Sequence, residues 1–168
     1  MNYTSAEAAK LLRQFNEEHT AILMKERQSK EFLAAMGEDI ESVRPAYDYK
    51  TVQEQLEAIE EKIRRLKHAI NTFNITHIVP GFDMTIDQML IYIPQLTARK
   101  NKLAEMRNTL PKTRDYASAG RTNIIDYRYA NYDISAVEAD YHKVSELLSK
   151  AQLALDAVNT KETMEIEL

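Results

Sequence analysis

A stripe of apolar side chains in residues 52–73 constrains the fold of this chain more than any other feature. Its members are Val52, Leu56, Ile59, Ile63, Leu66, Ile70 and Phe73. Their spacing alternates between four and three residues, the pattern that keeps one side of an α-helix against a partner helix. Similar stripes recur three more times, which predicts a mainly α fold: an antiparallel four-helix bundle with long, coiled-coil-like helices.

The four helices are expected at about residues 5–36, 52–73, 86–110 and 134–158. Each opens with a hydroxyl residue that has Glu or Gln three positions later, the pattern of a capping box. The four pairs are Thr4 with Glu7, Thr51 with Glu54, Thr85 with Gln88, and Ser135 with Glu138. Gly37 is expected to end the first helix, and Pro94 to kink the third.

The segments between the helices are irregular, at 74–84, 111–133 and the tail 160–168. Residues 123–132 and the end of the tail alternate between apolar and polar side chains, as strands do. We expect these segments to form one small patch of two or three β-strands. The patch would lie against a single helical-bundle domain that spans residues 1–168.

Composition narrows the class of protein. The chain is 44% hydrophobic and 29% charged, with 3 Gly and 4 Pro, which is typical of a folded helical protein. The absence of Cys excludes disulfides and thiol catalysis, and the formal net charge of −4 argues against binding to double-stranded nucleic acid. No apolar run or leader pattern indicates a membrane span or export, so we expect a soluble, cytoplasmic protein.

Several segments together carry a likeness to known sequences. They are Ile70–Asn74, the turn at Gly81, Met84–Gln88, Asn123–Asp133 and the helix end Leu155–Asn159. In this order they resemble the septicolysin-like family of small, largely uncharacterised bacterial helical proteins, over most of residues 40–162. One departure is Thr160, where such proteins often have an aromatic residue. The resemblance implies a fold, and the family name implies a haemolytic, pore-forming activity.

Hydrogen-bonding side chains gather around the turn between the second and third helices. They are Asn71, Asn74, Thr76, His77, Asp83, Thr85 and Gln88. The free N–H groups of the helix after Thr85 would favour an anion, and Tyr127, Arg128 and Tyr129 would add stacking and charge if their strand reached this end. This set, with the Tyr and Arg residues of 114–132, predicts a nucleotide-like small-molecule site. Alternatively, the polar residues only cap helices and brace the turn.

The apolar stripe of the first helix is interrupted by His19, Glu26 and Ser29. A polar seam of this kind indicates either that the helix extends past the bundle or that it contacts a second subunit through a more hydrated interface. On the second interpretation, these three residues lie in the interface of a homo-oligomer, a dimer or larger.

No pattern indicates catalysis. The four His residues form no i, i+4 pair and no Glu-x-x-His motif, so no metal site or cofactor is expected. We therefore expect a non-enzymatic interaction or structural protein that self-associates, with a small-molecule binding or sequestering protein as the alternative. A pore-forming protein, implied only by the family name, is a weaker third interpretation, because no helix has the Lys-rich face of a membrane-surface helix.

Overall fold

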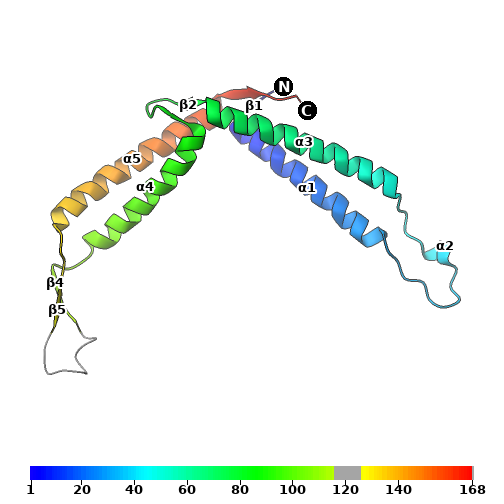
Figure 1. The fold of residues 1–168 in the computed structure, drawn as a ribbon, viewed down its shortest axis with the longest axis horizontal. Coiled ribbons are helices and arrows are strands. Elements are labelled where there is room, and N and C mark those ends of the chain that lie inside the picture. Colours follow the sequence, from blue (N-terminus) through cyan, green and yellow to red (C-terminus); the bar gives the residue numbers. More distant parts are fainter. Residues whose placement is uncertain (116–125, 168) are drawn as a thin grey trace. The chain divides into compact units, whose positions relative to one another are not determined.

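Long α-helices dominate the computed structural model of the protein, which describes residues 1–115 and 126–167 (Figure 1). The mainly helical fold predicted from the sequence is confirmed. Tertiary contacts divide the chain into two compact units, Met1–Thr76 with Val158–Leu168, and His77–Ala157. Each unit is built around one pair of long helices, and the four-helix bundle stays a prediction.

The first unit is an antiparallel helical hairpin of α1 (Ser5–Ser29) and α3 (Tyr49–Thr76), joined by a linker with the short helix α2 (Ile40–Val43). Strands β1 (Asn2–Thr4) and β6 (Thr163–Glu165) pair at one end of it and bring the two termini together (Figure 1). The core at this end is apolar throughout. Its members are Ala8, Leu66, Met164 and Ile166, with Tyr3, Leu11, Leu12, Phe15, Ala69, Ile70 and Phe73 packed around them.

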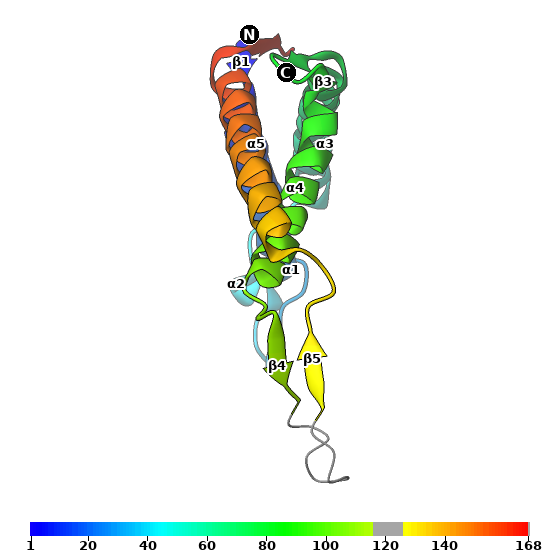
Figure 2. The same ribbon diagram turned by 90° about the vertical axis from the view of Figure 1, so that its left-hand side faces the viewer.

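The second unit begins with the strand pair β2 (Ile78–Val79) and β3 (Met84–Thr85), which leads into α4 (Ile86–Arg107). Strands β4 (Lys112–Arg114) and β5 (Tyr127–Tyr129) connect α4 to α5 (Ile134–Lys161), whose last residues belong to the first unit. Helices α4 and α5 lie side by side (Figures 1 and 2). The Arg107 guanidinium lies 4.0 Å from the centre of the Tyr141 ring.

Apolar side chains of both helices, together with Val79 of β2, form the buried part of this second unit. They are Ile86, Met89 and Leu96 on α4, and Val137, Val144, Leu148, Ala151 and Leu155 on α5. The α4 helix continues through Pro94. The hydroxyl of Tyr132 donates to the Met106 carbonyl at 2.9 Å, which fixes the start of α5 against the end of α4.

The helix ends differ from those predicted. Helix α1 ends at Ser29 rather than near 36, and Leu33 beyond it is 96% exposed. The apolar spacing continues past Ser29, but those side chains have nothing to pack against, so the stripe does not extend the helix. Gly37 lies in the linker with φ +89° instead of capping α1. Helix α4 ends at 107 rather than 110, while α3 and α5 are longer than expected.

Two of the four predicted capping boxes are confirmed, those of Thr4 with Glu7 and Thr85 with Gln88. The other two are wrong, because an Asp precedes each helix. The Asp48 carboxylate accepts from the Thr51 hydroxyl at 2.6 Å and from the Lys50 N–H at 3.1 Å. Asp133 accepts from the Ser135 N–H at 2.8 Å. An Asp side chain satisfies first-turn N–H groups directly, so both helices begin earlier than the hydroxyl residue suggests.

The single β patch predicted from the connections is also wrong. In the described residues the strands form three separate antiparallel pairs, β1 with β6, β2 with β3, and β4 with β5. The connection 74–84 folds back on itself, as does 111–133, while the tail pairs with residues 2–4. Part of the predicted strand segment 123–132 lies outside the described residues. Short connections pair locally because closing a small loop costs less entropy than a distant pairing.

Replacing the cap of α4, Thr85→Ala, is expected to lower the free energy of unfolding by about 1 kcal/mol. The change removes the hydroxyl that accepts from the Gln88 N–H. Thr97→Ala in the same helix is the matched control, because its hydroxyl bonds only to the Ile93 carbonyl within the helix. This control should be neutral or slightly stabilising. Urea unfolding followed by circular dichroism measures both, and equal losses would contradict the capping role.

Candidate functional site

The residues predicted to bind a ligand are divided between the two units. Asn71, Asn74 and Thr76 lie at the end of α3 in the first unit, and Thr76 donates its hydroxyl to the Thr72 carbonyl at 2.7 Å. This is the bond that Ser and Thr hydroxyls in helices commonly make to the carbonyl four residues earlier, so the Thr76 hydroxyl is satisfied within α3. It agrees with the alternative interpretation, in which the polar residues serve the helix end.

The other predicted residues of that turn belong to the second unit. They are His77, Asp83, Thr85 and Gln88. The Thr85 N–H donates to Gln88 Oε1 at 2.9 Å, and the Gln88 N–H donates to Thr85 Oγ1 at 3.3 Å. Asp83 has φ +48°, which fits a turn position. The His77 carbonyl accepts from the Ile86 N–H at 3.0 Å. These polar groups therefore form hydrogen bonds that stabilise the turn and cap the start of α4.

Tyr127, Arg128 and Tyr129 lie at the opposite end of α4 from Thr85, in β5. The 22 residues of α4 separate the two groups by about 33 Å. Lys112 lies 4.0 Å from the centre of the Tyr127 ring, and Arg128 forms an ion pair with Asp115 at 3.3 Å. The structure therefore does not bring the Tyr/Arg strand to the 71–88 turn, and one site made of both is wrong.

The polar seam of α1 has partners within the same chain. His19 Nε2 lies 3.2 Å from Glu60 Oε1 on α3. Glu26 Oε1 accepts from the Tyr47 hydroxyl at 3.0 Å and from Gln53 Nε2 at 3.2 Å. The seam is polar because it faces polar groups of α3 and of the linker. These contacts lie within one chain, and the place of His19, Glu26 and Ser29 in an oligomer interface stays a prediction.

A hollow of about 360 Å³ lies in the first unit beside Glu26, between the end of α1, the linker and the start of α3. Its lining includes Lys25, Glu26, Ser29, Tyr47 and Val52. Glu26 and Ser29 belong to the predicted oligomer interface, whereas Tyr47 is a lining residue that the sequence did not predict. The available signal was the position of Tyr47 directly before Asp48, whose side chain caps the start of α3.

Tyr47 titrates above its ordinary range. Its pKa is raised first by loss of hydration and then by the hydrogen bond to the Glu26 carboxylate. A raised pKa means that the folded state prefers the neutral phenol, so this contribution to stability is complete below pH 10 and is lost as the pH rises through the folded-state pKa. Deprotonation would leave two negative groups in contact.

The Glu26→Gln variant is therefore expected to lower the pKa of Tyr47 by removing the negative charge beside it. Ultraviolet difference titration of Glu26→Gln against the original chain measures the change, and the same comparison in a Tyr47→Phe background identifies the phenol responsible. A titration shift that persists without the Tyr47 hydroxyl would contradict the assignment.

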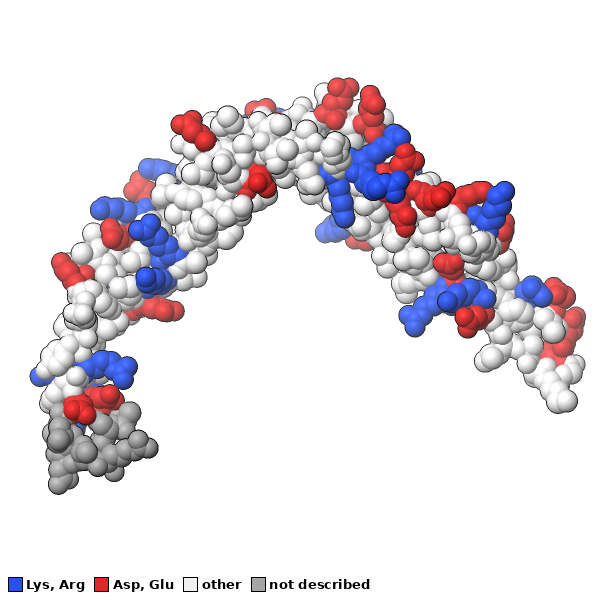
Figure 3. Space-filling model, in the orientation of Figure 1, with Lys and Arg blue, Asp and Glu red and all other residues white. Residues whose placement is uncertain are grey.

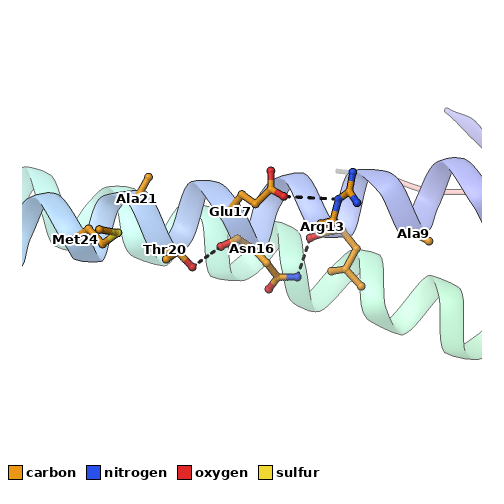
Figure 4. A pocket seen from close by; sticks show the side chains of 8 residues that line it. Ala9, Arg13, Asn16, Glu17, Thr20, Ala21 and Met24 are labelled. Carbon is orange, nitrogen blue, oxygen red and sulfur yellow. Dashed lines mark hydrogen bonds and ion pairs between the residues drawn. The ribbon is translucent and has the colours of Figure 1, made fainter.

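A second, more open hollow of about 550 Å³ lies along one flank of α1 (Figure 4). Its lining residues are Ala9, Leu12, Arg13, Asn16, Glu17, Thr20, Ala21 and Met24. Thr20 donates to the Asn16 carbonyl and Asn16 Nδ2 donates to the Leu12 carbonyl, both at 2.8 Å. Arg13 and Glu17 pair along the helix at 3.6 Å. The flank therefore combines exposed aliphatic surface, ending in Met24, with the charged side chains of Arg13 and Glu17, which are 76% and 71% exposed.

Charge and metal-ligand patterns single out no further site. Figure 3 shows Lys and Arg mixed with Asp and Glu over the face that it draws. Among the residues described, no group of three or more His, Asp or Glu side chains is placed to hold a metal ion. A search of the same residues for a helix long and apolar enough to cross a membrane finds none.

Comparison with solved structures finds one similar fold. The crystal structure of a functionally unknown conserved protein from Corynebacterium diphtheriae matches with a TM-score of 0.61 and 12% sequence identity, covering 98% of this chain and 100% of that chain. At this identity the likeness shows the fold alone. No protein-family model and no curated protein sequence matches the chain. Membership of the septicolysin-like family stays a prediction.

Proposed function

We propose that this chain is a non-enzymatic helical interaction protein that self-associates. The observation that carries the proposal is the exposed flank of α1, where Met24 is 58% exposed. A hairpin of two helices covers only one side of each helix, so a further layer could cover the exposed Met24 and its neighbours on α1. A second copy of the hairpin would provide that layer.

Such a dimer would contain a four-helix bundle of another kind than the predicted one, which consists of the four long helices of a single chain. The flank lies about a third of a turn around α1 from the side that packs on α3. In a four-helix bundle each helix contacts two neighbours on adjacent sides. Helix α1 would contact its own α3 on one side and a helix of the second copy on the next, so two hairpins would complete the bundle between them.

Native mass spectrometry of mixed copies tests the proposal. Unlabelled protein and ¹⁵N-labelled protein are combined and left to exchange. We expect a species of intermediate mass, containing one chain of each kind, at about twice 19.4 kDa. Detection of single chains alone, at concentrations up to several hundred micromolar, would contradict self-association.

A small-molecule binding protein is the second candidate, favoured by the hollow beside Glu26 and Tyr47. It combines aliphatic walls with Lys25, Glu26 and the Tyr47 hydroxyl, the mixture of apolar surface and few polar groups that small-molecule sites have. Mass spectrometry of compounds released from the purified protein by heat tests it. A compound present in stoichiometric amount, and lost in Tyr47→Ala, would support binding, while an empty release would count against it.

A further inference from the structure

We infer that two copies of the chain pack the flank of α1 lined by Ala9, Arg13, Asn16, Glu17, Thr20 and Met24 against itself, antiparallel, about a two-fold axis between Asn16 and Glu17. The inference rests on the proposed self-association and specifies its surface and register. These six residues follow one another along α1 at the spacing of a single helix side and line the 550 Å³ hollow.

The sizes of the side chains match in this register. A two-fold axis between Asn16 and Glu17 places Met24 of one copy level with Ala9 of the other, so the longest apolar side chain meets the smallest. It also places Arg13 level with Thr20. A large residue opposite a small one lets two helices approach closely, as knobs of one helix fill holes of the other.

The charges match as well, and only when the helices are antiparallel. Arg13 of each copy then lies three residues, or about 4.5 Å along the axis, from the level of Glu17 of the other copy, so two ion pairs form across the axis. A parallel pair in register would instead set Arg13 against Arg13 and Glu17 against Glu17. Like charges at an interface suppress that arrangement.

The size of the surface sets the strength to expect. Residues 9 to 24 of α1 extend over about 24 Å, and one helix flank of that length is small for a protein interface. The dimer should therefore dissociate on dilution into the micromolar range rather than persist at all concentrations. Dissociation in this concentration range would distinguish a dimer formed by the flank alone from one with a large obligate interface, which would stay associated.

Cysteine cross-linking tests the register, since the full chain has no Cys of its own. Asn16→Cys, next to the axis, should form a disulfide-linked dimer under mild oxidation. Ala9→Cys or Met24→Cys alone should not, because each lies about 23 Å from its own equivalent, but a mixture of the two should cross-link. Glu18→Cys, on another side of α1, is the control and should stay uncross-linked.

Charge reversal provides a second test, in a chain without introduced Cys. Arg13→Glu should weaken the dimer by about tenfold or more, and the double variant Arg13→Glu with Glu17→Arg should restore it. If copies associate but the Ala9→Cys and Met24→Cys mixture does not cross-link and Arg13→Glu has no effect, the register is overturned while self-association stands. If no dimer forms at any concentration, self-association fails and the register with it.

Discussion

Leu66→Ala is expected to lower the free energy of unfolding by about 2–5 kcal/mol. Leu66 is completely buried in the first unit, among Ala8, Met164 and Ile166. Truncation removes the burial of a branched side chain and leaves a cavity where α3 meets the tail, and a two-helix hairpin has few other buried side chains that could close it.

Leu33→Ala is the matched control, the same substitution at a site that is 96% exposed in the linker. Its effect should stay within about 0.5 kcal/mol. Chemical denaturation at one protein concentration measures both variants, because self-association would otherwise change the apparent stability. A loss below 1 kcal/mol at Leu66, or equal losses at the two sites, would contradict the core assigned to the first unit.

Met89→Ala is expected to have an effect of similar size, about 2–5 kcal/mol, in the second unit. Met89 is completely buried on α4, one turn after the capped start of the helix. Its side chain belongs to the apolar side of α4 that Ile86 and Leu96 continue. Loss of the thioether removes contacts that no exposed residue can replace.

The neighbouring Leu90→Ala is the control for Met89, because Leu90 lies on the same helix turn but half exposed. It should cost much less than Met89→Ala. Thermal unfolding followed by circular dichroism, at a fixed protein concentration, compares them. A larger loss for Leu90 than for Met89 would mean that the buried side of α4 has been assigned to the wrong residues.

The apolar stripe predicted α3 well because its spacing is a local property of the chain. Leu56, Ile59 and Leu66 of the stripe are buried, as the 3.5-residue period requires. The end of α1 was harder to predict, since the same kind of spacing continues to Met36. A helix persists only where a partner covers its apolar side, and the partner's start at Tyr49 depends on Asp48 rather than on the stripe.

Strand β1 could not be predicted from its own residues. Asn2–Thr4 is too short to show an alternating pattern, and it becomes a strand only by pairing with Thr163–Glu165 at the other end of the chain. One strand of the β4–β5 pair could be predicted from the sequence, because Tyr127 and Tyr129 alternate with Arg128. Its partner Lys112–Arg114 gives no strand signal of its own.

The candidate ligand residues show why a cluster in the sequence need not be a site. Thr85 and Gln88 are close in the chain because a capping box requires that spacing, and their polar atoms bond to one another. Tyr127 and Arg128 follow α4 rather than precede it, so the helix length alone separates them from the turn. The flank of α1 was not predicted as an interaction surface, because the sequence shows no apolar stripe there. Its polar residues are Arg13, Asn16, Glu17 and Thr20, and the structure shows that they bond to one another or to the backbone of α1.

Sedimentation equilibrium of the full chain over a range from micromolar to several hundred micromolar tests the central claim most directly. We expect the weight-average mass to rise with concentration from 19.4 kDa toward twice that value, and the rise to shift to higher concentration in Arg13→Glu. A mass that stays at 19.4 kDa over the whole range would contradict self-association.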